Sequence, residues 1–179
     1  ITWLATIQLP DFNNFENRNI ANSTKIYDRT GKIVLYNIHD NVRRTAVPIT
    51  EISPYIKQAT ISIEDAHFYE HYGFRPTSFA RAMLANVTSG GYSQGGSTIN
   101  QQVIKNALLT REKTISRKLK EILLSIKLDR ELPKDTILQI YLNESPYGGT
   151  IYGVEEASLV FFNKKASEVT LTEAAYLAA

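Results

Sequence analysis

Apolar residues recur at helical spacing through most of the chain after residue 51. Ser53 and Pro54 are typical of an N-cap and a first helical position. Four apolar positions of this first helix are expected to face the core: Ile52, Ile56, Ala59 and Ile63. The same spacing predicts further helices over 77–88, 98–109, 114–132, 134–143, 154–162 and from 172 onward, and Thr170 with Glu173 suggests a capping box. The pattern therefore predicts a mainly α protein.

The first fifty residues follow a different pattern. Residues 1–22 are polar and rich in asparagine, which is typical of a linker or arm. Residues 25–27 and 32–38 flank the turn sequence 28–31 and predict a small β-hairpin. We therefore expect an arm over 1–22, a hairpin and connection over 23–50, and a helical domain over 51–179. The chain starts without methionine and ends within a helical pattern, so we expect a piece of a longer protein, truncated at its C-terminus.

Composition narrows the classes of function. The 179 residues are 43% hydrophobic and 21% charged, which is typical of a folded globular domain. The absence of cysteine excludes disulfides and thiolate metal sites. A formal charge of +2 gives little support to nucleic-acid binding. Residues 101–134 nevertheless hold nine Lys or Arg against four acidic residues, so one region is basic. No apolar run is as long as a membrane span.

A glycine-loosened turn at Gly96 leads into a predicted helix whose start is rich in hydroxyl, carboxamide and amino groups. The polar candidates are Ser97, Thr98, Gln101, Gln102, Lys105 and Asn106. Thr98, Gln102 and Lys105 are expected on one face, with Ile99, Val103, Ile104 and Leu108 on the buried side. Free N–H groups at a helix start attract anions. This stretch is either a clamp for a phosphorylated sugar or an ordinary polar helix face.

The next predicted helix carries a basic stripe. Lys113, Arg117, Lys120 and Glu121 share helical spacing, and the apolar side is expected to be Ile115, Leu119, Ile122, Leu123 and Ile126. An exposed face of salt bridges is one interpretation, and spacing alone favours it. The other is a pyrophosphate grip in which Glu121 orients the cations.

Three other features leave alternatives open. Glu64 and Asp65 point apart on a helix and do not form a carboxylate dyad, so one can face a cleft while the other braces the structure. His71 is expected to be structural, and no histidine-based metal site is expected. The apolar positions of residues 79–87 fit either the core or a membrane surface.

Four motifs, read in order, resemble those of the peptidoglycan glycosyltransferases, glycosyltransferase family 51. This family includes monofunctional enzymes and the N-terminal catalytic domain of class A penicillin-binding proteins. The motifs are Glu64-Asp65-x-x-Phe68-x-x-His71-x-Gly73, the run from Gly96 to Asn106, Arg117-Lys118-x-x-Glu121, and Lys134-x-x-Ile137-Leu138-x-x-Tyr141-Leu142-Asn143. A fifth is approximated over 153–162. Asn100, Lys113, Glu156 and Phe161 depart from the usual residues, which leaves substrate affinity and cleft shape open.

The resemblance implies a lysozyme-like helical fold, with the glycosyltransferase domain over 51–179. It implies lipid II and the nascent glycan chain as substrates and Glu64 as the general base. Glu121 would position the leaving pyrophosphate or the cations that bind it. The implied binding residues are Ser97, Thr98, Gln101, Gln102, Lys105, Asn106, Lys113, Arg117, Lys118 and Lys120.

The resemblance also implies partners and a location. It implies a membrane surface, moenomycin-type inhibitors and the outer face of the bacterial cytoplasmic membrane, with an anchor upstream of residue 1. No cofactor is required from the sequence, and a divalent cation, Mg²⁺ or Mn²⁺, stays open. No nucleic-acid partner is expected.

Two other classes of function stay open. A lysozyme-like lytic transglycosylase or hydrolase also uses a helix-borne glutamate, but neutral sugars give no reason for a basic stripe. A catalytically silent lipid-binding scaffold is the second alternative. The joint presence of Glu64, Lys105 and Glu121 counts against it.

Overall fold

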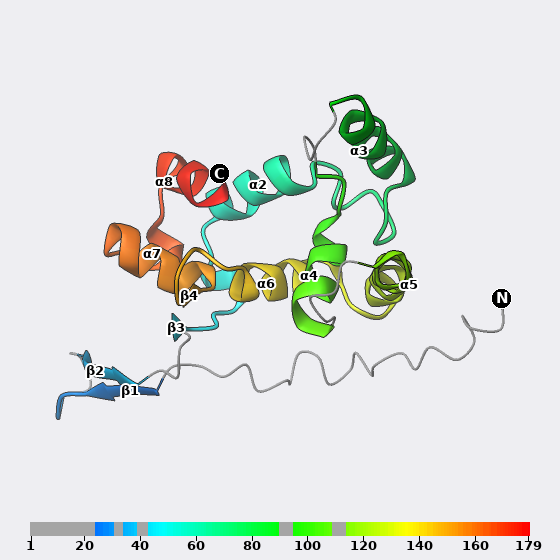
Figure 1. Ribbon diagram of the computed structural model, residues 1–179. Helices are drawn as coiled ribbons and strands as arrows, with labels where there is room; N and C mark the ends of the chain where they lie inside the picture. The colour runs from blue at the N-terminus through cyan, green and yellow to red at the C-terminus, as the bar shows by residue number, and fades with distance from the viewer. Residues whose placement is uncertain (1–23, 31–33, 39–42, 90–94, 109–113) are drawn as a thin grey trace. The chain divides into compact units, whose positions relative to one another are not determined.

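The computed structural model describes residues 24–30, 34–38, 43–89, 95–108 and 114–179. The chain divides into two compact units. Unit 1 contains His71–Pro133, and unit 2 contains the segment that ends at Glu70 together with Lys134–Ala179. The described residues are mainly helical, and a small antiparallel hairpin precedes the helices (Figure 1). The predicted mainly α fold class with an N-terminal hairpin is confirmed. Residues 1–22 of the predicted arm lie outside the described residues.

Unit 2 begins with the hairpin. Strand β1 (Thr24–Tyr27) pairs antiparallel with β2 (Val34–Ile38) in the register Thr24↔Ile38, with a bulge at Ile26/Tyr27. The short strands β3 (Arg43–Arg44) and β4 (Ile151–Tyr152) pair in parallel. The other elements are the helices η2 (Ile49–Glu51), α2 (Pro54–Glu64), α6 (Lys134–Glu144), α7 (Val154–Phe162), η3 (Ala166–Glu168) and α8 (Leu171–Ala178).

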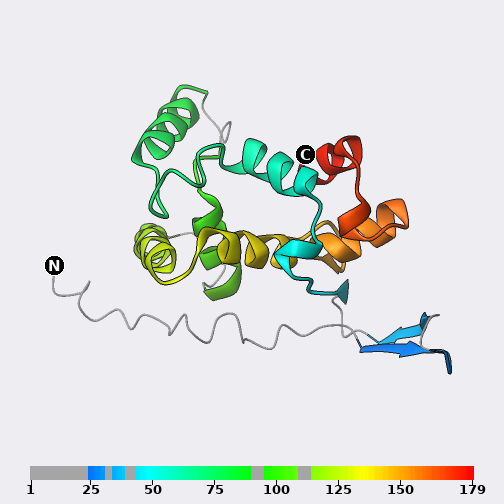
Figure 2. The same cartoon turned by 180° about the vertical axis from the view of Figure 1, so that it is seen from behind.

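Helix α2 starts and ends where its sequence indicates. The Ser53 hydroxyl accepts a hydrogen bond from the N–H of Tyr55, and Pro54 occupies the first turn, as predicted. Helix α2 lies beside α8 in both views (Figures 1 and 2). Ile56 is buried as expected, but the prediction for Ile63 is wrong, because its side chain is 56% exposed. Ile63 lies in the final turn, and the buried positions of α2, Ile56 and Thr60, are in the earlier turns.

The segment before η2 is attached to α6 by side-chain amides. Asn143 accepts a hydrogen bond from the N–H of Val47 at 3.0 Å and donates one to its carbonyl oxygen at 2.9 Å. Gln139 Oε1 accepts from the N–H of Ile49 at 2.7 Å. Glu156, one of the residues that departs from the family pattern, is buried. Its carboxylate accepts a hydrogen bond from the Thr45 hydroxyl. Residues 45–49 are therefore fixed to the helices of unit 2.

Unit 1 is built from α3 (Pro76–Thr88), α4 (Ile99–Leu108) and α5 (Ile115–Glu131). Helices α4 and α5 pack together in both views (Figures 1 and 2). The core of this unit includes Ile99, Val103, Ile104, Leu124 and Leu128. The first three were predicted to face inward. The side chain of Leu108 lies outside the described residues.

The apolar side expected for α5 is only partly covered, with Ile122, Leu123 and Ile126 half-buried. Ile115 is 91% exposed and Leu119 is also exposed, whereas Glu121 is 1% exposed. The buried side of the helix consists of Glu121, Leu124, Ser125 and Leu128. This face includes a carboxylate because Glu121 finds cationic partners there, a compensation that hydrophobic periodicity does not detect. Lys113 lies outside the described residues.

Helix α3 carries exposed apolar side chains. Met83 and Leu84 are 62% and 67% exposed, while Phe79 is half-buried. The apolar positions of residues 79–87 were expected either in the core or at a membrane surface. Met83 and Leu84 are not in the core. The side chain of Val87 lies outside the described residues. None of the helices in the described ranges has both the length and the apolar content needed to cross a bilayer.

Candidate active site

Glu64 is the last residue of α2, and its side chain is exposed. It borders a hollow of about 200 Å³ within unit 2. The other residues of this hollow are Thr60, Tyr141, Ser145, Pro146, Tyr147, Leu177, Ala178 and Ala179. A carboxylate that opens into a polar hollow is accessible to a hydroxyl group of a bound sugar.

Two tyrosines of the hollow respond to the charge of Glu64. Burial, followed by the negative charge of Glu64, raises the pKa of Tyr141 to about 12. Burial also raises the pKa of Tyr147, with further contributions from Tyr141 and Glu64. Both phenols are therefore protonated at neutral pH and retain O–H donors.

Asp65, the neighbour of Glu64, is buried at the end of α2. Its side chain is 5% exposed. Its N–H donates to Ile61 at 3.0 Å, and its carbonyl accepts from Phe68 at 2.8 Å. The two adjacent carboxylates thus have different environments, as their helical spacing predicted.

His71 fits the structural interpretation, because its Nδ1 accepts a hydrogen bond from the N–H of Gly73 at 3.0 Å. Within the residues that the structure describes, no group of three His, Asp or Glu side chains could hold a metal ion.

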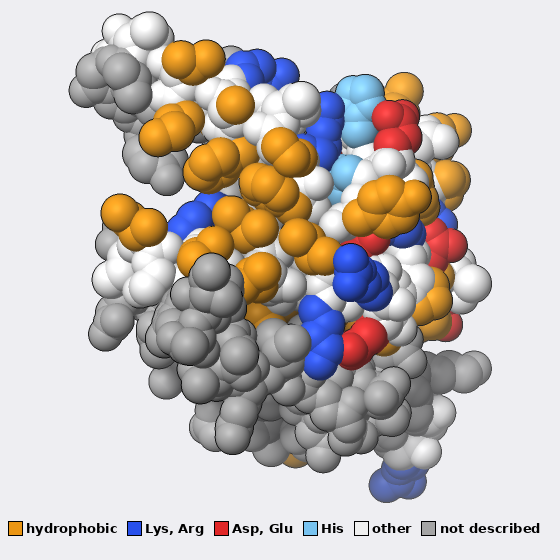
Figure 3. Space-filling model, turned by 90° about the vertical axis from the view of Figure 1, so that its right-hand side faces the viewer, with side chains coloured by type: hydrophobic (Ala, Val, Ile, Leu, Met, Phe, Trp, Pro, Cys, Tyr) orange, Lys and Arg blue, Asp and Glu red, His pale blue; other side chains and the backbone are white. Residues whose placement is uncertain are grey.

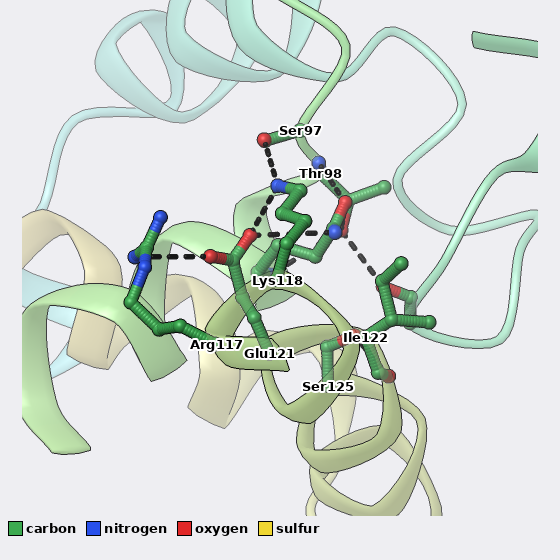
Figure 4. Close-up of polar contacts among 9 residues, drawn as sticks. Ser97, Thr98, Arg117, Lys118, Glu121, Ile122 and Ser125 are labelled. Atoms are coloured by element: carbon green, nitrogen blue, oxygen red, sulfur yellow. Dashed lines mark hydrogen bonds and ion pairs between the residues drawn. The ribbon is translucent and has the colours of Figure 1, made fainter. Parts of the chain in front are cut away.

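A second group of polar side chains lies in unit 1, between α5 and the start of α4. We call Ser97, Gln101, Arg117, Lys118 and Glu121 the cation cluster. Glu121 Oε1 accepts from the ammonium of Lys118, which also donates to Ser97 Oγ at 2.8 Å. Glu121 Oε2 lies 3.5 Å from Arg117 Nη1. Figure 4 shows the carboxylate between the two cations, with Ser97 on the far side of Lys118.

The charges of the cation cluster do not cancel. Glu121 supplies one negative charge, whereas Arg117 and Lys118 supply two positive charges. The Lys118 and Arg117 side chains are 29% and 19% exposed, so a ligand can reach both of them. Arg117 Nε is buried, and among the described residues it has no hydrogen-bond partner. This arrangement can bind an anion with fixed donors.

The other predicted binding residues, and Gln101 of the cation cluster, differ in their burial. Thr98 and Gln101 are buried, and their polar atoms bond to one another and to neighbouring groups. Lys105 and Asn106 are exposed on α4, and Gln102 and Lys120 are half-buried. Contact of these residues with a substrate stays a prediction.

Sequence reasoning assigned no site role to the residues around Glu64. Tyr141 was part of a recognised motif, and that was the available signal. Thr60 lies one turn before Glu64 on α2, so helical spacing was the signal that could have found it. Ser145 and Tyr147 gave no signal, because they meet Glu64 only through tertiary packing.

The comparisons with known proteins cover most of the chain. Residues 31–179 match the family model described as Transglycosylase. The chain is 42% identical over 157 residues to penicillin-binding protein 1F of Bacillus subtilis, which is 88% of this chain and 22% of that protein. It is 41% identical over 171 residues to penicillin-binding protein 1A of Aquifex aeolicus, or 96% of this chain and 23% of that protein. Penicillin-binding protein 1A of Escherichia coli is 38% identical over 171 residues, 96% of this chain and 20% of that protein.

The chain spans about a fifth of the length of these curated relatives. The match nevertheless includes Glu64 and the whole cation cluster, since the family model extends from residue 31 to residue 179. The chain belongs to the transglycosylase family, the peptidoglycan glycosyltransferases that its motifs resemble.

Proposed function

We propose that this domain polymerises lipid II into β-1,4-linked glycan strands and releases undecaprenyl pyrophosphate. The growing chain is the donor, and the 4-hydroxyl of the lipid II GlcNAc is the acceptor. The hydroxyl oxygen attacks C1 of the donor muramic acid, and the bond from C1 to the pyrophosphate oxygen breaks with inversion. The hydroxyl proton passes to Glu64, and the leaving pyrophosphate keeps the electron pair.

Glu64 is suited to the role of general base. Its carboxylate is accessible at the end of α2 and borders the hollow in unit 2. A base must reach the proton that it accepts, and a carboxylate in a polar hollow meets this geometric requirement. The protonated phenols of Tyr141 and Tyr147 can donate hydrogen bonds to sugar oxygens in the same hollow.

The observation that carries the proposal is the excess positive charge of the cation cluster. A departing pyrophosphate needs charge stabilisation more than protonation. Lys118 and Arg117 share one buried carboxylate, so one positive charge stays uncompensated. Ser97 fixes Lys118 through the 2.8 Å hydrogen bond. We infer that these donors hold the leaving group, assisted by Lys105, Lys120 and Lys113, while Gln102 and Asn106 bind sugar and phosphate oxygens.

The same proposal places unit 1 at a membrane surface. Hydrophobic side chains gather on the face shown in Figure 3. Among the described residues of unit 1, five large apolar side chains are exposed: Tyr72, Met83, Leu84, Ile115 and Leu119. A lipid-linked substrate keeps its polyprenyl tail in the bilayer, so an apolar surface on the enzyme would reduce the cost of approaching it. We infer that the domain acts at the outer face of the cytoplasmic membrane.

A lytic transglycosylase or hydrolase is the alternative function. It would cleave existing strands of neutral sugars, and a cluster that retains a net positive charge would then have no ligand. The cation cluster therefore favours the transferase.

The experiment incubates the protein with labelled lipid II in detergent and separates the products by size. The proposal predicts glycan polymer, and a moenomycin-type phosphoglycolipid should suppress its formation by occupying the same cations. Release of muropeptides from purified cell wall, without polymer from lipid II, would establish the alternative.

A further inference from the structure

Gln101 is a polar side chain with no exposed surface, buried between α4 and α5. We propose that Gln101 is a positioning residue that fixes the carboxylate of Glu121, and that it does not contact the substrate. The inference rests on the proposed function of the cation cluster. It changes the role of one residue that the family resemblance placed among the binding groups.

The orientation of the Gln101 amide is set by its oxygen. Oε1 accepts a hydrogen bond from the N–H of Thr98 at 3.0 Å. A backbone N–H can only donate, so the amide oxygen must face Thr98 and the amide nitrogen must face the other way. That nitrogen lies 3.4 Å from Glu121 Oε1 and donates to it. The amide therefore presents a donor to the carboxylate in a defined direction.

Thr98 is in turn fixed to the rest of unit 1. Its hydroxyl donates to the carbonyl of Gly73 at 2.7 Å and accepts from the N–H of Gln101 at 3.3 Å. Gly73 packs so closely on α5 that an added Cβ would lie 2.2 Å from the Ser125 carbonyl oxygen. Ser125 is one helical turn beyond Glu121. The hydrogen bonds, together with the close packing of Gly73 on Ser125, thus form a frame that begins and ends on α5.

The frame determines which oxygen of Glu121 meets which cation. Oε1 receives Lys118 and Gln101, and Oε2 is left toward Arg117. Without the donor of Gln101, Arg117 and Lys118 alone hold the carboxylate, and the three charged groups can shift together to other positions. The donors would then no longer be arranged in advance for a pyrophosphate, which weakens stabilisation of the transition state more than binding of the ground state.

The test compares Gln101→Met and Gln101→Glu with the parent in steady-state polymerisation of lipid II. Methionine keeps the volume and removes both polar groups. Glutamate keeps the acceptor for Thr98 but replaces the donor with a second carboxyl oxygen beside Glu121, and it serves as the second variant if methionine fails to fold. The 3.4 Å hydrogen bond is long, so we expect a fall in kcat of roughly tenfold for methionine, with KM nearly unchanged, and a larger fall for glutamate.

A double-mutant cycle separates positioning from other roles. In a Glu121→Met background, Gln101→Met should cost less than about twofold, because the oxygen that accepts from Gln101 is gone. Gln139→Met is the matched control: it removes a glutamine that holds the backbone of Ile49, and it should leave the polymerisation rate at the parent value.

Three results would overturn the inference: a rise in KM with kcat intact, a full tenfold loss in the Glu121→Met background, or parent activity in both Gln101 variants. Each of these requires a parent that polymerises lipid II. A parent that forms no polymer would instead refute the proposed function, and the inference with it.

Discussion

Replacement of Gly73 by alanine tests whether close backbone packing supports the cation cluster. Gly73 has φ of +81°, and an added Cβ would lie 2.2 Å from the carbonyl oxygen of Ser125 and 2.7 Å from its carbonyl carbon. A left-handed conformation costs an L-residue about 1–2 kcal/mol, and forcing atoms into a packed site costs about 1–3 kcal/mol. Both obstacles are backbone atoms of α5, so rotation of a side chain cannot relieve them.

We therefore expect Gly73→Ala to lower the free energy of unfolding by about 3 kcal/mol, measured by urea denaturation, and to lower Tm by roughly 6–12 °C. Gly148 and Gly149 provide matched controls. Their φ values of +104° and +54° bracket that of Gly73, and nothing lies within 4 Å of an added Cβ at either position. Gly148→Ala and Gly149→Ala should therefore lower the free energy of unfolding only by the conformational cost of positive φ. If Gly73→Ala is no more destabilising than these two variants, the close contact with α5 does not exist and the frame around Thr98 loses its support.

Other predictions concern unit 2. Asn143→Leu removes two hydrogen bonds to one backbone unit and should lower the free energy of urea unfolding by about 2 kcal/mol; an unchanged midpoint would contradict this. The hydrogen bond from Lys164 is the main cause that lowers the pKa of Glu173 from 4.5 to about 2. Because the pKa is lower in the folded state, the ionised carboxylate stabilises the fold above about pH 4.5, and this stabilisation is lost as the pH falls through about 2. The Tm difference between parent and Glu173→Gln should accordingly be constant near neutral pH and shrink over that acid range, whereas a difference that grows in acid would reverse the sign. Tyr141 should titrate at about 12 in carbon NMR of labelled tyrosine, and Glu64→Gln should lower that pKa; no change would mean that the two groups do not interact.

The sequence was a good guide to helices and their ends. Helix starts depend on residues in or next to the first turn, here the N-caps Ser53 and Thr114 and the first-turn prolines Pro54 and Pro76. Because these effects need no tertiary information, the predicted starts agree with the structure to within a residue or so. The capping box at Thr170 and Glu173 forms for the same reason, with the Glu173 carboxylate accepting from the N–H and the hydroxyl of Thr170.

Burial was harder to predict than helicity. Spacing alone favoured an exposed, salt-bridged face for the stripe that includes Glu121, because a charged residue is seldom buried without partners. A pyrophosphate grip was the other interpretation. One partner of Glu121, Gln101, lies on α4, twenty residues earlier in the chain. The periodicity of α5 alone cannot reveal a partner on another helix. Conversely, their spacing put Ile115 and Leu119 on the apolar side of the helix, yet both are exposed. Apolar spacing cannot distinguish a face that packs on protein from one that remains uncovered.

The candidate site was predicted in part for similar reasons. The resemblance selected Ser97, Arg117, Lys118 and Glu121, and the structure brings these four together in unit 1. The hollow beside Glu64 was not predicted, because its walls come from residues 60, 141, 145–147 and 177–179. Only tertiary packing joins such distant segments.

The most direct test of the mechanism is a comparison of Glu64→Gln with the parent in two assays on the same preparation. The first is polymerisation of labelled lipid II, and the second is affinity for a moenomycin-type phosphoglycolipid, which reports on the cation cluster. If Glu64 is the general base, polymerisation should fall by at least about a hundredfold, while affinity for the phosphoglycolipid stays within about twofold of the parent. Polymerisation at the parent rate by Glu64→Gln would contradict the central claim.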